Sequence, residues 1–113
     1  MESRNEVVLV GRVPAVAQER VLPSGDVLLS WRLVVDRPAQ APPRQAGRRP
    51  VLLDTVDCVA WTAAVRRTAA RFQVGDVVAV EGALRRRFWR AGSGAASRCE
   101  VEVTGARRLS RRP

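Results

Sequence analysis

Residues 74–89 read VGDVVAVEGALRRRFW, and this stretch organises the rest of the chain. It opens with a turn at Gly75 and Asp76 and continues into an apolar, β-branched run suited to a buried strand. Past Gly82 the chain becomes strongly basic and ends in two aromatic residues, Phe88 and Trp89. We therefore expect a strand that changes from a buried segment to a basic one at the glycine.

The basic half of this strand has two distinct faces, because side chains alternate along an extended chain. One face carries Arg85, Arg87 and Trp89, and the other carries Leu84, Arg86 and Phe88. Two guanidinium groups beside an indole suit a flexible polyanion with flat bases. The pattern predicts binding of single-stranded nucleic acid, and a solvated strand edge that discourages aggregation is the alternative.

The length and charge of the chain narrow the possible classes of protein. With 113 residues it is long enough for one domain with one core. The formal net charge is +9, and all 20 basic residues are arginine. Such a balance points to phosphate-bearing or other acidic partners, although a charged surface without any ligand explains the composition equally well.

The residue types that the chain lacks argue against catalysis. It contains no histidine and no lysine, so the commonest general base, the commonest metal ligand and the lysine of a phosphate-binding loop are all missing. Its two cysteines, Cys58 and Cys99, are too few for a zinc site. We expect no enzyme activity, no cofactor, no metal and no small-molecule substrate. Both cysteines lie in expected strands, where a small buried side chain is the favoured interpretation, and a disulfide between them stays open.

No segment looks like a targeting signal or a membrane span. The apolar run at residues 7–10 is short and follows the acidic Glu2 and Glu6. We therefore expect a cytoplasmic, nucleoid-associated protein without a membrane partner.

The hydrophobic pattern predicts an all-β domain with one short α-helix. The expected strands are residues 5–13, 27–36, 51–61, 74–89 and 97–109. Thr62 can cap a helix that runs to about Phe72, between the third and fourth strands. Loops are expected at 15–21, at 37–50, which is long, basic and flexible, and at 91–96, with a turn at 22–25. This order is that of a five-stranded OB-fold barrel, placed in residues 1–110 and followed by a short basic tail at 111–113.

Two strand patterns predict how the barrel packs. Trp31 alternates with Leu33 and Val35, so we expect it in the core and not at a binding surface. Residues 7–10 and 77–80 are apolar on both faces, which predicts that part of the barrel exterior is an interface between subunits. We expect a homo-oligomer, either a dimer or a tetramer.

Several blocks of sequence occur in an order typical of one family. They are NEVVLVGR at 5–12, PSG at 23–25, CVAW at 58–61, VGDVVAVEG at 74–82 and LRRRFW at 84–89. Each block alone is weak, but their order and spacing, from about residue 5 to 109, resemble the bacterial single-stranded DNA-binding protein family. The resemblance implies a non-catalytic OB-fold protein, usually a homotetramer, that coats single-stranded DNA in replication, recombination and repair.

The resemblance also implies roles for single residues. Trp61 and Trp89 stand where the family has aromatic residues that stack on bases, with a core position as the alternative for Trp61. The predicted DNA-binding set is Trp61, Trp89, Arg85, Arg87, Arg20, Arg12, Arg32 and Arg4. Stacking and phosphate contacts need no reading of base edges, so we expect little sequence specificity, and RNA stays open as a ligand beside DNA.

The chain departs from the family pattern at three places. Thr55 and the loop at 37–50 stand where the family often has aromatic residues, so fewer bases would stack per subunit. The sequence ends at Arg111-Arg112-Pro113 in place of a long tail with an acidic tip, so we expect a tail-less or divergent paralogue. The missing aromatic residues favour a second hypothesis, an OB-fold accessory subunit of a replication or repair assembly that acts through protein contacts and has weakened DNA binding, whereas the face with Arg85, Arg87 and Trp89 argues against it.

Overall fold

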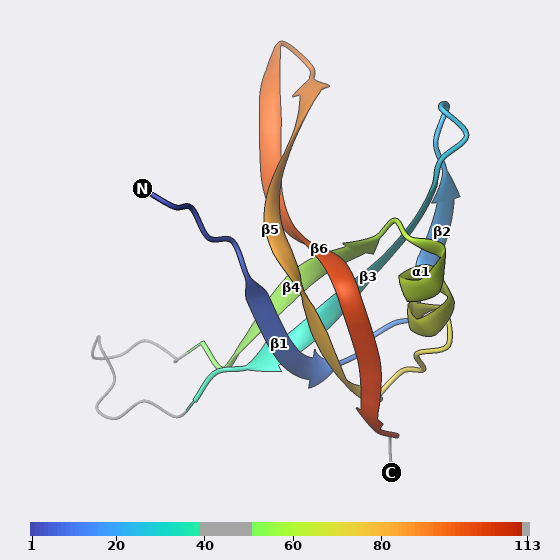
Figure 1. Cartoon of the computed structure of the whole chain (residues 1–113). Helices are drawn as coiled ribbons and strands as arrows, with labels where there is room; N and C mark the ends of the chain where they lie inside the picture. The colour runs from blue at the N-terminus through green and yellow to red at the C-terminus, as the bar shows by residue number, and fades with distance from the viewer. Residues whose placement is uncertain (39–50, 112–113) are drawn as a thin grey trace.

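The computed structural model describes residues 1–38 and 51–111, which form six strands and one helix (Figure 1). The elements are β1 (Val7–Arg12), β2 (Gln18–Val21), β3 (Val27–Asp36), β4 (Leu53–Ala60), α1 (Ala63–Ala69), β5 (Val77–Ala91) and β6 (Gly94–Ser110). Residues 39–50 of the expected basic loop and 112–113 of the expected tail lie outside the described residues. In the described part of the chain, no helix has the length and apolar character needed to cross a membrane.

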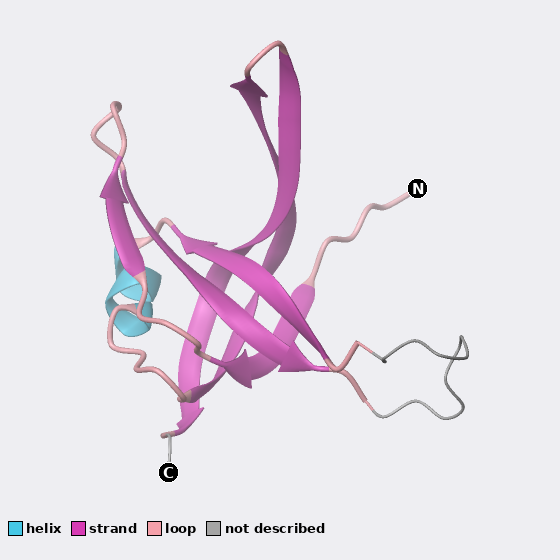
Figure 2. Ribbon diagram, turned by 180° about the vertical axis from the view of Figure 1, so that it is seen from behind, coloured by secondary structure: helices cyan, strands magenta, loops and turns pink. Residues whose placement is uncertain are grey.

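The strands close into a barrel (Figure 2). Their order in the sheet is β1-β5-β6-β4-β3-β2, and β1 also pairs with β3, where Arg12 lies opposite Val34. The neighbouring strands are antiparallel except for β4 and β6, which run parallel with Cys58 beside Val101. Closure of the ring, with one helix between β4 and β5, confirms the expected OB-fold barrel.

The first long strand of the barrel is broken into β1 and β2. Both halves pair with β3, and they are separated by residues 13–17, which include Pro14. Proline has no backbone N–H and cannot continue the ladder, so the strand is interrupted there. The expected loop at 15–21 is therefore wrong for Gln18–Val21, although β1 and β2 counted as one strand give the expected five. All four residues of β2 are exposed, so no apolar alternation marked it in the sequence.

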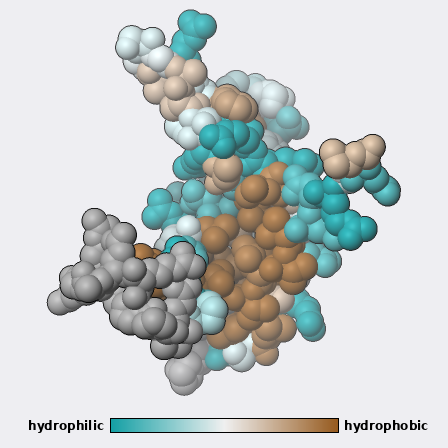
Figure 3. Space-filling view, turned by 90° about the vertical axis from the view of Figure 1, so that its left-hand side faces the viewer, coloured by the Kyte–Doolittle hydropathy of each residue, from teal (hydrophilic) through white to brown (hydrophobic). Residues whose placement is uncertain are grey.

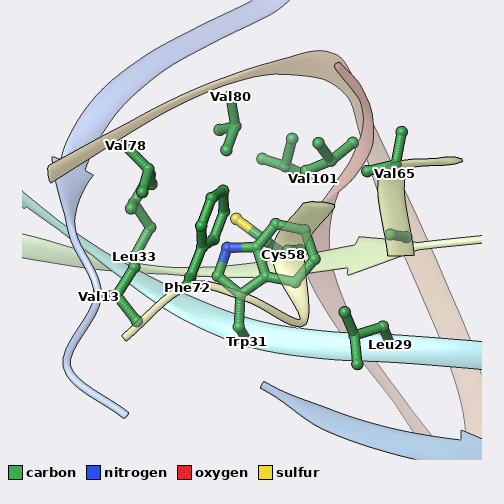
Figure 4. Close-up of a cluster of buried hydrophobic side chains, with 13 residues drawn as sticks. Val13, Leu29, Trp31, Leu33, Cys58, Val65, Phe72, Val78, Val80 and Val101 are labelled. Carbon is green, nitrogen blue, oxygen red and sulfur yellow. The ribbon is translucent and has the colours of Figure 1, made fainter. Parts of the chain in front are cut away.

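The core of the barrel is filled from alternate strand positions (Figure 4). On β3, the side chains of Leu29, Trp31 and Leu33 are buried in one cluster, which confirms the expected core position of Trp31. The Trp31 ring meets Phe72 edge-on, with the ring centroids 6.3 Å apart and an interplanar angle of 79°. Cys58 is buried beside them, as expected.

Helix α1 begins where the sequence predicted but ends earlier. The Thr62 hydroxyl caps it by accepting a hydrogen bond from the Val65 backbone N–H at 3.4 Å. The last helical residue is Ala69, three residues before the expected end at Phe72. The Phe72 side chain is nevertheless buried in the core, because the turn after the helix keeps the apolar face in place.

A buried carboxylate fixes the connection between α1 and β5. The Asp76 side chain accepts a hydrogen bond of 2.8 Å from the Gln73 backbone N–H. Its Oδ2 also lies 2.8 Å from Nε of Arg108 on β6. This network ties the start of β5 to the last strand of the barrel.

A register shift between Glu81 and Gly82 marks where β5 changes from an apolar to a basic strand. A Cβ atom at Gly82 would overlap the carbonyl oxygen of Glu102 on β6. Glycine is therefore required at this position, because β6 approaches the backbone more closely than any side chain allows.

Past this glycine, β5 and β6 form a hairpin that stands out from the barrel (Figure 1). Pairing is one-to-one from Gly82 to the last pair, Ala91 opposite Gly94. Only Gly92 and Ser93 remain for the tip, so the expected loop at 91–96 is too long. The uninterrupted ladder fixes which side chains of β5 and β6 share a face.

Strand β1 is apolar on both sides, as expected, but its outer side is open. Val7 and Leu9 pack against the core. Val8 and Val10 face outward and are 73% and 50% exposed. Figure 3 shows a large apolar area on one side of the molecule. An exposed area of this kind is typical of an interaction surface.

Candidate nucleic-acid interface

The basic half of β5 keeps the alternation expected from the sequence. Its pairing with β6 places Arg85, Arg87 and Trp89 on one face of the hairpin, beside Arg98 and Glu100. Trp89 is 46% exposed and lies outside the core cluster. The two guanidinium groups and the indole therefore share a face, and the indole ring is available for a base to stack on.

The opposite face of the hairpin carries Leu84, Arg86 and Phe88. The Arg86 guanidinium lies 6.0 Å from the centroid of the Phe88 ring and 3.7 Å from the sulfur of Cys99. Cys99 is exposed, so its expected burial is wrong, because the hairpin has left the barrel and no layer covers this face. Both cysteines are free thiols in this structure.

Carboxylates on β6 form ion pairs with the two arginines on the hairpin face that carries Trp89. The Arg85 Nε lies 2.7 Å from Oε2 of Glu102, and the Arg87 Nε lies 3.3 Å from Oε1 of Glu100. The Arg85 pair is half-exposed and contributes little to stability. Its main effect is on position, because it holds the guanidinium on this face. Phosphates of a bound strand would compete with the carboxylates for both arginines.

A cleft of about 370 Å³ lies beside this face. Its walls come from the bend between β1 and β2, from β3 and β4, and from β6. The polar residues that line it are Gln18, Ser30, Arg32, Asp57, Arg98 and Glu100. The β5–β6 hairpin and the β2–β3 turn project from the same end of the barrel (Figure 1), and the cleft lies near the bases of these two arms.

Two further predicted residues belong to this region. Arg32 lines the cleft, and its Nε lies 3.4 Å from Oδ1 of Asp57. Arg20 lies on β2 two residues after Gln18, so both project from the same face of that strand. The structure thus brings Arg32 and Arg20 toward the cleft that the hairpin borders.

Trp61 follows β4 directly and is half-buried. On β4, Asp57, Cys58 and Val59 line the cleft, and Trp61 follows two residues after Val59. Trp61 does not belong to the buried core cluster. Trp61 therefore lies close in sequence to cleft residues and outside the core cluster, and its stacking role stays a prediction.

The last two predicted residues, Arg4 and Arg12, do not line the cleft. Arg4 precedes β1 and is adjacent to Asn5, whose side-chain amide exchanges two hydrogen bonds of 2.8 Å with the backbone of Leu84. These bonds keep Arg4 near the base of the basic strand. Arg12 lies on the outer side of β1, 3.4 Å from a carboxylate oxygen of Asp36, and the structure does not bring it to the other residues.

Sequence reasoning missed the acidic and amide residues of the cleft. Glu100 and Asp57 fall inside the expected strands at 97–109 and 51–61, where no role was assigned to them, and Gln18 falls in the expected loop at 15–21. The alternation around Glu100 was visible, but its position opposite the arginines depends on the hairpin register. That register follows from the two-residue tip at Gly92 and Ser93, for which the glycine itself was the available sequence signal; the structure places Gly92 at positive φ.

Comparisons with known proteins agree with this architecture. Among solved structures, the chain is similar to one described as Plasmodium falciparum SSB in complex with ssDNA, with a TM-score of 0.80 and 18% sequence identity over 97% of this chain and 98% of that chain. No curated protein matches the chain at a significant level. The model of the single-strand binding protein (SSB) family matches residues 4–109. The match covers the barrel and the hairpin alike, and the chain therefore belongs to the single-strand binding protein family.

Proposed function

We propose that the chain binds single-stranded DNA along the hairpin face that carries Arg85, Arg87 and Trp89. Membership of the single-strand binding protein family supports this function. The observation that carries it is the exposed indole of Trp89 on the same face as two arginines. A base stacked on an aromatic ring contributes roughly 1–3 kcal/mol whatever its identity, and arginines neutralise phosphates, so most contacts need no base sequence.

A titration of the protein with a dT oligomer at several salt concentrations tests this proposal. Binding should quench tryptophan fluorescence and weaken as salt rises. With about four phosphates neutralised per bound segment, log K against log salt should have a slope of about −3. A duplex of the same length should bind much less tightly. Absence of binding to dT would contradict the proposal. Tight binding whose affinity does not change with salt concentration would show that the arginines do not contribute to it.

We also propose that this binding serves replication, recombination or repair in the cytoplasm, by a protein that is not an enzyme. The family assignment supports a binding role. The lack of histidine and lysine in the sequence supports the absence of catalysis.

The ion pairs of the hairpin favour a second candidate function. Glu100 and Glu102 offset the charge of Arg87 and Arg85, which lowers the attraction of this face for phosphate. An accessory subunit that acts through protein contacts, with weakened DNA binding, fits this observation. The same titration separates the two candidates, because an accessory subunit with weakened DNA binding would need a much higher oligomer concentration to quench the tryptophan fluorescence.

A further inference from the structure

We propose that the cleft beside the hairpin holds one base of the bound strand and prefers a base with an exocyclic amino group, cytosine in first place, over thymine. This inference rests on the proposed binding of single-stranded DNA. It adds one selective position to a surface that otherwise binds by stacking and charge.

The side chain that carries the inference is Glu100. It is 3% exposed, lines the cleft, and shares the hairpin face of Arg85 across the β5–β6 ladder. Its Oε1 lies 3.3 Å from Nε of Arg87, but its Oε2 is buried and has no hydrogen-bond partner among the described residues. Buried polar atoms in folded proteins nearly always have a partner, so an unpaired carboxylate oxygen beside a cleft is a position that a hydrogen-bond donor of a ligand can complete.

The ion pair with Arg87 links this carboxylate to the phosphate backbone. A bound strand that draws the Arg87 guanidinium to a phosphate removes the partner of Glu100 at the same time. The carboxylate of this cleft-lining residue then needs donors for both of its oxygens. An amino group on a base supplies such donors at the moment when the backbone of the same strand has engaged the arginine.

The other polar groups of the cleft complete the match to cytosine. The amino group of cytosine donates hydrogen bonds that a glutamate oxygen can accept, and the neighbouring ring nitrogen and carbonyl oxygen of the base are acceptors. Arg98 lines the cleft and supplies donors for those acceptors. Thymine has a carbonyl oxygen in place of the amino group, so two acceptors would face each other. The cleft volume of about 370 Å³ is at the lower end of ligand pockets, which span roughly 300–1,000 Å³, and it leaves room for one pyrimidine base.

Paired titrations with dC and dT oligomers of equal length, at neutral pH and one salt concentration, test the inference. The proteins are the wild type, Glu100→Gln and Glu102→Gln. Glu102 is the matched control, because it pairs with Arg85 at 2.7 Å on the same face but does not line the cleft. We expect the wild type to bind dC about fivefold or more tightly than dT. Glu100→Gln should bring this ratio close to one, and Glu102→Gln should leave it unchanged.

Each other outcome has a defined meaning. Equal wild-type affinity for dC and dT overturns the base-selective cleft but leaves the proposed function standing, whereas binding to neither oligomer contradicts the proposed function itself. A ratio that collapses in Glu102→Gln as well as in Glu100→Gln also overturns the inference, since release of an arginine would explain both.

A second measurement needs no variant and applies even if Glu100→Gln fails to fold. An oligomer of N4,N4-dimethylcytosine lacks the amino protons but keeps the ring. The wild type should bind it no more tightly than dT. A preference that survives the methylation overturns the inference.

Discussion

At the scale of single residues, Trp89 is the side chain on which binding should depend most. We expect Trp89→Ala to weaken the affinity for a labelled dT oligomer by about 1–3 kcal/mol, because one stacked base is lost. Its ring is 46% exposed, so the urea midpoint should change little. Phe88→Ala on the opposite face of the hairpin is the control and should leave affinity nearly unchanged. Anisotropy of the labelled oligomer measures both, and equal losses in the two variants would remove the special role of Trp89.

Cys58 is the residue through which alkaline pH acts on stability. Burial, with the negative charges of Asp57 and Glu100, raises the pKa of its thiol from 9.0 to about 12. Between these values the unfolded chain has released a proton that the folded chain keeps, so stability falls as pH rises. We expect the free energy of unfolding to be level below about pH 8.5 and then to fall by up to about 1.4 kcal/mol per pH unit.

The composition of the chain isolates this effect. It has no tyrosine and no lysine, so few other kinds of side chain change charge in that pH range. Urea unfolding at a series of pH values measures the slope. Cys58→Ala should lower the free energy of unfolding overall but remove most of its decrease above about pH 8.5. An unchanged decrease in this variant would show that another group titrates.

Residue positions that depend only on backbone alternation could be predicted from the sequence. Arg85, Arg87 and Trp89 share a face because a strand alternates whatever it packs against. The ion pair of Arg87 with Glu100 and the exposure of Cys99 could not be predicted. They depend on the hairpin register and on where the barrel stops covering β6, and both are set by tertiary contacts.

At the scale of elements, Gly82 decides how the hairpin leaves the barrel. We expect Gly82→Ala to destabilise the fold by roughly 1–3 kcal/mol, because the added methyl group would overlap the Glu102 carbonyl and force β5 and β6 apart. The matched control is Gly94→Ala, where an added Cβ meets no atom within 4 Å. Urea unfolding of both variants measures the difference. Equal stability of the two variants would mean that the strands shift at no cost.

Elements with strong local signals were predicted well. The bounds of β3, Val27–Asp36, are those expected, because its inward side chains alternate over its length. The start of α1 was predicted from the capping residue Thr62, whereas its end has no comparable signal. Strand β2 was missed because it is short and exposed, and among the described residues the one strand it pairs with is β3.

At the scale of the whole molecule, the open side of β1 predicts self-association. Within the described residues, β1 pairs with β3 only at Arg12, so much of one edge is open beside the exposed Val8 and Val10. We expect the wild type to sediment as a dimer or tetramer. In the double variant Val8→Asp, Val10→Asp, the dissociation constant of the oligomer should rise at least about tenfold, because two apolar contacts per subunit are replaced by charges.

Val21→Asp is the control for this experiment. Val21 is 66% exposed on β2, so its replacement tests the effect of a new surface charge alone. It should leave the sedimentation of the wild type unchanged. A wild type that sediments as a monomer would contradict the prediction.

The carboxylates that hold the hairpin arginines also bear on how the protein moves once it is on its ligand. A guanidinium that lets go of a phosphate has Glu100 or Glu102 within reach, tethered at an effective concentration that dissolved ions do not match. Single contacts can then break one at a time while their neighbours hold. We expect the protein to move along a bound strand by such local exchanges, without complete dissociation at each step.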